Sequence, residues 1–269
     1  MVTTRQYLLQ NIEAVSAFNL ETNENLFAVT DLQEANLVNE QETVYATGKN
    51  GIRIGAADRN KASRFTATNG KIDEGVFATQ LGSPVETGTY VSRNYKDVLT
   101  LDGSAEATLT FKAQGEAGAE IKFAYIRSAS GSPGEKLTQD TAAGAGTFAY
   151  DPATNKVTFD TALAGSGVIV FYDVKVVGGK KISNEENKFS MTVLAIYDCW
   201  FKDPCTDKSY VGRIIYPKAK VSGNFEFSFG SDFSVQSLEF EALSGGCGAD
   251  GASVLWDIEI FDEEDIEAA

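Results

Sequence analysis

The sequence of 269 residues contains no histidine, and cysteine, proline and methionine are rare. The lack of histidine excludes nucleophiles that are activated by a histidine base, and it excludes zinc sites completed by imidazole. The three cysteines, Cys199, Cys205 and Cys247, show no CxxC spacing, so free thiols are expected rather than a Cys199–Cys205 disulfide. Rare proline together with 43% apolar residues predicts a folded chain rather than a disordered one.

Long apolar runs and positive charge are also scarce. No stretch approaches the roughly 18 apolar residues of a membrane span, and the opening MVTTRQYLLQNIEAV has no basic region ahead of an apolar one. We therefore expect neither a membrane anchor nor a secretion signal. With 23 basic and 38 acidic residues the net charge is −15, which repels phosphate and disfavours binding to nucleic acid or to an anionic membrane.

What is present is the pattern of an antiparallel all-β protein. Turn residues at short intervals separate runs rich in β-branched and aromatic residues, as in a β-sandwich or a barrel. Helices are predicted at only two places, Arg5–Ala17 and Asp73–Leu81. The second prediction rests on Asp73 and Glu74, which suit a first helical turn, and on Gly82, which suits the end of a helix.

Composition divides the chain into three parts. Residues 1–102 form the first part, with the helix near 73–81 and a meander of paired strands over Thr43–Thr68, where TGKNG and DRNK mark turns. Residues 103–177 are rich in small residues and are expected to form a middle insertion or an elaboration packed on the sandwich, with a separate small module as the alternative. Residues 178–269 return to long strands and end in DEEDIEAA, an acidic run whose expected role is solubility.

In the last part, alternation along the chain assigns two faces to strands expected over Ala219–Phe229, Ser234–Leu243 and Val254–Phe261. The expected core-facing residues are Phe225, Phe227, Phe229, Leu238, Phe240, Ala242, Val254, Trp256, Ile258 and Ile260. The opposite face carries the acidic residues Glu226, Glu239, Glu241, Asp257 and Glu259. Two interpretations of this acidic set stay open: the solvated outer face of an antiparallel sheet, which is favoured, and the lining of a channel.

No sequence pattern identifies a catalytic, cofactor-binding or metal-binding residue, and no cofactor is expected. Glu239 and Glu241 would lie about 6.6 Å apart on one strand face, which suits the carboxylate pair of a glycosidase. Any acidic strand face provides such a pair, however, so the solvated interpretation is favoured. The chain has neither a DxDxDG calcium loop nor a GxxxxGK[ST] phosphate loop.

Three stretches resemble the major tail tube proteins of tailed bacteriophages. They are FNLETNENLFAVTDLQEANL, then VYATGKNGIRIGAADRNKASRFTATNGKIDEGVFATQLG, and finally PKAKVSGNFEFSFGSDFSVQSLEFEAL with the closing strand LWDIEIFDE. Together they cover about residues 18–82 and 217–263. The similarity lies in strand order and turn placement rather than in a catalytic signature.

The resemblance implies a non-enzymatic structural protein of the virion tail that is made in the host cytoplasm. In that family a β-sandwich subunit with a flanking helix contributes strands to an oligomeric β-barrel, and stacked hexameric rings form the tail tube. The flanking helix would correspond to Asp73–Leu81. The implied partners are further copies of the chain, the tape measure protein, and the tail tip and tail terminator proteins, while DNA passes without adhesion during ejection. The long middle part favours the non-contractile tail of a siphovirus.

Several alternatives remain at this point. The channel would be lined either by the acidic set or by strands from Thr43–Thr68, whose exposed face is mixed and carries Arg53, Asp58, Arg59, Lys61 and Arg64. A capsid decoration or receptor-binding protein is the next candidate function, and a carboxylate-dependent glycosidase is less favoured.

Overall fold

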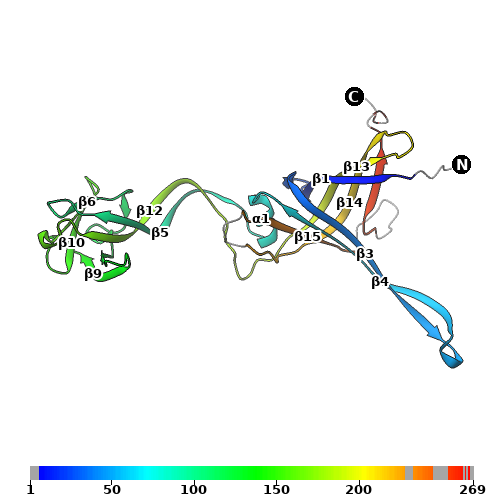
Figure 1. Ribbon diagram of the computed structural model, residues 1–269, viewed down its shortest axis with the longest axis horizontal. Coiled ribbons are helices and arrows are strands. Elements are labelled where there is room, and N and C mark those ends of the chain that lie inside the picture. The colour runs from blue at the N-terminus through cyan, green and yellow to red at the C-terminus, as the bar shows by residue number, and fades with distance from the viewer. Residues whose placement is uncertain (1–5, 228–232, 245–253, 263, 265, 267–269) are drawn as a thin grey trace. The chain divides into compact units, whose positions relative to one another are not determined.

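The computed structural model describes residues 6–227, 233–244, 254–262, 264 and 266, and it separates into two compact units. Unit 1 is formed by the chain before Glu86 and after Lys181, and unit 2 by Glu86–Lys181. Each unit is built around one curled sheet, and the described residues include a single α-helix and two short 3-10 helices. The expected all-β class is therefore confirmed (Figure 1).

Unit 1 contains an eight-stranded antiparallel sheet in the order β2-β1-β13-β14-β15-β4-β3, with β16 paired to β14 beside β15. Its strands are β1 (Leu8–Asn19), β2 (Asn25–Val29), β3 (Leu32–Thr47), β4 (Arg53–Asn69), β13 (Thr192–Lys202), β14 (Ser209–Val221), β15 (Gln236–Ala242) and β16 (Asp257–Phe261). The 3-10 helix η1 (Lys49–Gly51) joins β3 to β4, and α1 (Glu74–Leu81) follows β4.

The core of unit 1 follows from the alternation of buried and less buried side chains in β13, β14 and β15, which is interrupted at Pro217 and Lys218 of β14. Phe65, Tyr197 and Phe240 meet at its centre, with ring centroids 3.9 Å apart for Phe65 and Tyr197 and 5.8 Å apart for Tyr197 and Phe240. Leu238, Phe240 and Ala242 are buried as expected. Burial of a leucine or phenylalanine side chain contributes roughly 1.5–3 kcal/mol, so these strands anchor the unit.

The helix expected over Arg5–Ala17 is wrong, because the chain forms the strand β1 from Leu8 onward. Two irregularities in the β1–β13 ladder, after Leu9 and after Ile12, insert extra residues into β1. As a result the buried residues Ile12 and Val15 are three positions apart, which imitates helical spacing. A β-bulge thus explains the misleading period.

Helix α1 begins and ends where the sequence predicts. Asp73 is its N-cap and accepts a hydrogen bond from the Val76 N–H at 3.0 Å, while Gly82 ends it in the left-handed region with φ +64°. A Cβ atom at Gly82 would overlap the carbonyl oxygen of Phe189, so only glycine fits. The Gln80 side chain donates to the Ser237 carbonyl at 2.9 Å and ties the helix to β15.

The strand expected over Ala219–Phe229 ends early. Strand β14 stops at Val221, where its ladder with β15, which covers only 219–221, also ends, and residues 222–227 form no strand. Phe225 and Phe227 are half-buried and pack on Phe77 of α1 instead of entering the sheet core, with centroid separations of 5.4 Å and 5.1 Å. Phe229 lies outside the described residues.

Unit 2 contains a second sheet of eight strands in the order β5-β12-β8-β9-β10-β11-β6, with β7 paired to β12. Its elements are β5 (Glu86–Thr100), β6 (Glu106–Thr108), β7 (Ala113–Gln114), β8 (Phe123–Arg127), β9 (Pro133–Gln139), β10 (Thr147–Asp151), β11 (Lys156–Phe159), η2 (Thr161–Leu163) and β12 (Gly167–Lys181). All pairs are antiparallel except β9 with β10. A separate core forms inside the curl, where Phe148 stacks on Phe159 at 5.2 Å.

The two long strands of unit 2 enclose the segment that is rich in small residues. Strands β5 and β12 pair along most of their length, from Thr100 opposite Gly167 to Glu86 opposite Lys181. The unit therefore includes all of residues 103–177 together with the strands on either side of them. Its first and last residues are neighbours across the ladder, so the whole unit is inserted at one point of unit 1.

Candidate assembly surface

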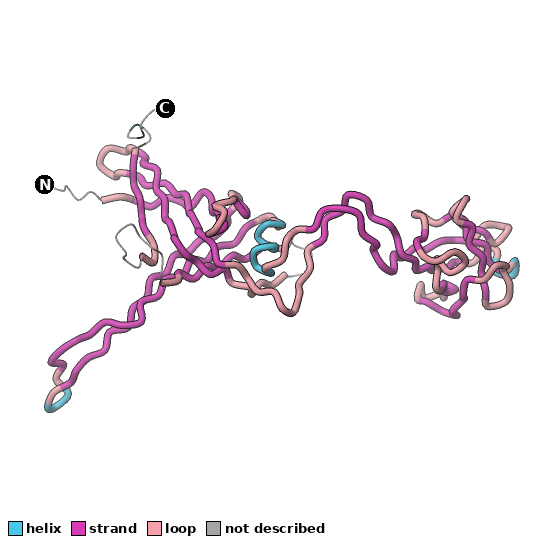
Figure 2. Tube along the Cα trace, turned by 180° about the vertical axis from the view of Figure 1, so that it is seen from behind, coloured by secondary structure: helices cyan, strands magenta, loops and turns pink. Residues whose placement is uncertain are grey.

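The most exposed feature of unit 1 is the outer part of the β3–β4 hairpin, residues 40–62, which we call the arm. In Figure 1 the arm leaves the sheet of unit 1, and Figure 2 shows the η1 turn at its tip. All ten residues of β4 from Arg53 to Ala62 are exposed, so neither face of the arm is covered by the described residues. A two-stranded hairpin on its own is at best marginally stable in water.

The sequence prediction of a meander over Thr43–Thr68 is wrong about DRNK. The TGKNG segment is a turn, but residues 58–61 belong to the single strand β4, in which Asn60 has φ +53° beside an irregular register. The turn-forming residues of DRNK therefore make a bulge, which twists the arm without ending the strand. Bulges and turns favour the same residues, and this is why the sequence suggested an extra turn.

Polar and aromatic contacts hold the arm in shape. Glu42 accepts hydrogen bonds from Arg59 at 2.7 Å and from Asn60 at 2.6 Å, and these bonds lower the pKa of the Glu42 carboxyl. Thr43 donates to Asp58 at 2.6 Å. Near the tip, the guanidinium of Arg53 lies 4.0 Å from the centre of the Tyr45 ring. These contacts fix the register of the arm, but they bury little apolar surface.

Large apolar side chains on the arm remain in solvent. Ile52 is 64% exposed and Ile54 is 71% exposed, and Val44 and Tyr45 are also exposed. Scattered exposed apolar residues are normal, but here they gather on a hairpin that lacks a core of its own. The arm also presents unpaired strand edges, which are templates for pairing with another chain.

Four of the five acidic residues singled out in the sequence lie on one face of the sheet. Glu239 pairs with Thr66 and Glu241 with Arg64 across the β15–β4 ladder, and Asp257 and Glu259 occupy β16. Side chains opposite each other in antiparallel strands share a face, and here that face is the one turned away from the buried core. Glu226 is exposed on the non-strand segment 222–227, apart from this ladder.

Positive side chains interrupt this acidic face. The Arg64 guanidinium lies 3.3 Å from the Glu239 carboxylate, and Arg213 of β14 lies 3.2 Å from Asp198 of β13. Glu259 is opposite Arg213, and Glu241 is opposite Lys220. The outward face of the unit 1 sheet is thus a mixed surface in which described cations have acidic neighbours.

Strand β16 is less buried than the sequence predicts. The register places Ile258 beside Ile214 and Ile260 beside Gly212, which is the expected core-facing side. Ile258 is nevertheless 47% exposed and Ile260 is 37% exposed, so these two burial predictions are wrong for the isolated chain. Val254 and Trp256 are only half-buried. This end of the sheet carries apolar side chains that the described residues leave partly uncovered.

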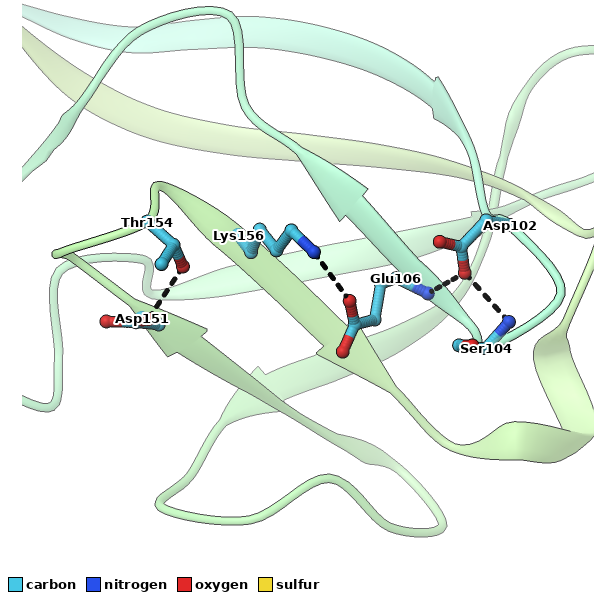
Figure 3. Close-up of polar contacts among 6 residues, drawn as sticks. All are labelled: Asp102, Ser104, Glu106, Asp151, Thr154 and Lys156. Atoms are coloured by element: carbon cyan, nitrogen blue, oxygen red, sulfur yellow. Dashed lines mark hydrogen bonds and ion pairs between the residues drawn. The ribbon is translucent and has the colours of Figure 1, made fainter.

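Polar contacts of Asp102, Glu106 and Asp151 fix two turns and link two strands of unit 2. Lys156 pairs with Glu106 at 3.0 Å. Asp102 accepts hydrogen bonds from the N–H groups of Ser104 and Glu106, and Asp151 accepts one from the Thr154 hydroxyl (Figure 3). The pKa of Asp102 is lowered by those backbone hydrogen bonds, and that of Asp151 by the Thr154 hydroxyl. Lowered pKa values keep these carboxyls ionised, in the role of turn formers.

The described cysteines and acidic residues do not assemble into a metal site. Cys199 is buried and Cys205 is exposed, both thiols are free, and Cys247 lies outside the described residues. Burial, with a smaller contribution from Asp198, raises the pKa of Cys199 to about 11. Over the part of the chain that the structure describes, no group of three metal-ligating side chains gathers, and no helix is long and apolar enough to cross a membrane.

The sequence reasoning missed the arm as a single element. It found the tip turn and the charged residues Arg53, Asp58 and Arg59, but it placed Arg53 in a short strand and Asp58 and Arg59 in a second turn. One signal was available: between residues 39 and 62 apolar residues do not alternate with polar ones, as they do in the half-buried strands β13 and β15. A strand with one buried face alternates apolar and polar residues, and a strand buried on both faces is apolar throughout. A strand with neither pattern has both faces exposed to solvent.

Comparison with models of protein families identifies the family of this chain. The sequence profile described as the YomU/Tube protein family matches residues 8–251, which include nearly all of both units. No curated protein matches the chain. A profile match over most of the 269 residues shows that the chain belongs to the YomU/Tube protein family.

Proposed function

We propose that this chain is the tube-forming structural protein of a tailed phage, and that it assembles as stacked hexameric rings through which DNA is delivered. The observation that carries the proposal is the arm, a long hairpin with both faces and its edges exposed in the single chain. Pairing or packing against another copy would cover Ile52, Ile54, Val44 and Tyr45 and would satisfy the open edges. Membership of a tube protein family supports the same role.

In this proposal the unit 1 sheet joins its neighbours into an oligomeric β-barrel, since closure across subunits removes sheet edges. The edges available for this are β3, β16 and β2, each of which has one strand partner among the described residues. The partly uncovered Ile258 and Ile260 support a subunit contact at β16. Tape measure, tail tip and tail terminator proteins are the further partners that we propose.

We also propose that the outward face of the unit 1 sheet lines the channel. A cation that is already paired with a carboxylate gains less from a phosphate contact, and Arg64 and Arg213 are both paired in this way. Such a surface is wet and charged but does not hold DNA. In this proposal the residues of this face are exposed to solvent on the single chain, and the same residues line the channel once the tube has assembled.

The location of the chain in virions tests the proposal. Gold-labelled antibodies raised against this chain are expected to mark the tail along its whole length, because a tube protein repeats from one end of the tail to the other. Labelling of the capsid alone, or of the tail end alone, would overturn the proposal in favour of a decoration or receptor-binding protein.

A further inference from the structure

Unit 2 contains an open cavity of about 400 Å³ beside the middle of its long strands β5 and β12. Strands β5, β7, β8 and β12 and the loop over 115–122 supply its walls, so it lies wholly within this unit. The residues that line it include Asn94, Glu116, Glu120, Phe123, Phe171 and Asp173. The volume suits a small ligand or the terminal residues of an oligomeric ligand.

A strand irregularity builds the rim of the cavity. The β5–β12 register shifts between Tyr172 and Val174, and at this point Asn94 adopts φ +55°. The Asn94 N–H donates to Asp173 Oδ1 at 2.9 Å, which fixes the bulge and holds the carboxylate at the wall. Bulges of this kind re-aim side chains and are frequent beside binding sites.

Aromatic rings form the apolar part of the wall. Phe123 and Phe171 lie with their centroids 6.3 Å apart, and Tyr125 packs on both at 5.6 Å and 6.1 Å. Lys136 lies 4.8 Å from the centre of the Phe123 ring and braces it. All three rings are half-buried, so they are held in place and still face solvent.

Polar groups of both kinds complete the wall. Glu120 is oriented by hydrogen bonds from Gln139 at 2.8 Å and from the Gly118 N–H at 3.0 Å, while Glu116 is exposed. With Asp173 these carboxylates are acceptors, and the Lys122 ammonium and the Gln114 amide, which also line the cavity, are donors. The carboxylates outnumber the one lining cation, so the cavity repels anions.

We propose that this cavity binds a neutral oligosaccharide. Hydroxyl groups both donate and accept hydrogen bonds, and the C–H faces of a sugar ring pack on the electron-rich faces of aromatic rings. A phosphate or sulfate ligand would meet three carboxylates, and a cationic ligand would lie beside the Lys122 ammonium, which repels it. A neutral polyhydroxylated ligand uses both halves of the wall. The inference concerns unit 2 alone and holds whether or not unit 1 forms a tube.

The test uses the full chain and four neutral hexasaccharides, made of α-linked glucose, β-linked glucose, N-acetylglucosamine and galactose, measured by calorimetry and by saturation-transfer NMR. At least one is expected to bind with a dissociation constant of about 1 mM or tighter. Phe171→Ala is expected to abolish this binding. Glu116→Gln, at an exposed position that does not affect folding, is expected to weaken it roughly tenfold by removing a charged acceptor. Glu135→Gln, on β9 and away from the cavity, is the matched control and is expected to leave it unchanged.

Three outcomes would overturn the proposal. The first is the absence of binding by all four hexasaccharides at millimolar concentration. The second is binding that both Phe171→Ala and Glu116→Gln leave unchanged. The third is tighter binding of a sulfated hexasaccharide or of tetramethylammonium than of any neutral sugar, because it would show that the cavity selects charge.

Discussion

At the scale of single residues, the buried tyrosines Tyr197 and Tyr216 in the core of unit 1 differ in the hydrogen bonding of their hydroxyl groups. Tyr216 and Ser63 share a hydrogen bond of 2.7 Å between their hydroxyl groups, whereas the Tyr197 hydroxyl is buried without a hydrogen-bond partner among the described residues. The two rings touch edge to face at 5.3 Å. A buried polar group without a partner costs stability, so these neighbours make opposite contributions through the same atom type.

This contrast gives the first prediction. Tyr216→Phe is expected to lower the free energy of unfolding of unit 1 by about 0.5–1.5 kcal/mol, because the buried hydrogen bond to Ser63 is lost, while the Ser63 hydroxyl keeps its bond to the Val38 carbonyl at 3.3 Å. Tyr197→Phe, its matched control in the same cluster, is expected to be neutral or stabilising. Urea unfolding followed by tryptophan fluorescence measures both, since the two tryptophans of the chain, Trp200 and Trp256, belong to unit 1. Equal destabilisation by both changes would contradict the assignment.

The same tyrosines predict an alkaline limit to stability. Burial raises the pKa of Tyr197 well above its ordinary value, with a smaller contribution from Tyr216, and burial also raises the pKa of Tyr216. A raised pKa in the folded state means that folding favours the protonated form. Unit 1 is therefore expected to lose stability as the pH rises above about 10, where tyrosines of the unfolded chain ionise.

Unfolding free energies measured between neutral pH and pH 11 test this sign. Tyr197→Phe is expected to lose less stability over that range than the unchanged protein, because one of the ionising groups is gone. A loss that is the same in both proteins would show that Tyr197 ionises in the folded state without difficulty.

At the scale of elements, the sequence predicts what local chemistry determines. Asp73 and Gly82 mark the ends of α1, and alternation places Leu238, Phe240 and Ala242 in the core, because capping and side-chain period act within a few residues. The bulges in β1 and β4 and the early end of β14 at Val221 depend on partner strands far away in the sequence. The spacing of apolar residues along one strand gives no information about partner strands that are distant in the sequence.

For the candidate assembly surface, too, the sequence predicted the faces of single strands but not the contacts between strands. The residues of the acidic face were found from alternation, and Glu239, Glu241, Asp257 and Glu259 do share a face. Their pairing with Arg64, Arg213 and Lys220 was not predicted, because it depends on register between strands that are distant in sequence. The cavity of unit 2 was missed for the same reason, since its wall joins residues from 94 to 173.

The arm gives the prediction at this scale. Replacing residues 43–58 by Asn-Gly joins Glu42 to Arg59, which are already opposite each other, through a two-residue hairpin turn. Folding of unit 1 is expected to change by less than about 0.5 kcal/mol, because the removed residues contact no core. Assembly is expected to be lost, and sedimentation would show monomers.

A point change separates the apolar tip from the rest of the arm. Ile54→Asp is expected to weaken assembly strongly, and Ile72→Asp is the matched control, since Ile72 is 56% exposed but lies beside α1 rather than on the arm. If Ile54→Asp assembles at the same protein concentration as the unchanged chain, the tip is not part of a subunit contact.

At the scale of the whole molecule, the two units have separate cores and meet in sequence at one point. Glu86 and Lys181, the first and last residues of unit 2, are partners in an antiparallel ladder, so their Cα atoms are about 5 Å apart. The proposed roles follow this division: unit 1 carries the arm and the open sheet edges, and unit 2 carries the saccharide cavity.

This division predicts the result of removing unit 2. A chain in which Asn-Gly replaces Glu86–Lys181 is expected to fold with an unchanged tryptophan unfolding midpoint and to assemble as the full chain does. It is expected to bind none of the hexasaccharides. Failure of the shortened chain to fold would show that unit 1 needs unit 2 for its stability.

The central claim is that this chain builds a tube from copies of itself. The most direct measurement is electron cryomicroscopy of the purified full-length chain at increasing concentration. The account predicts stacked six-fold rings around a channel that admits duplex DNA, with the arm of each subunit packed against a neighbouring copy. Discrete monomers at every concentration, and no tube of this chain in purified virions, would contradict it.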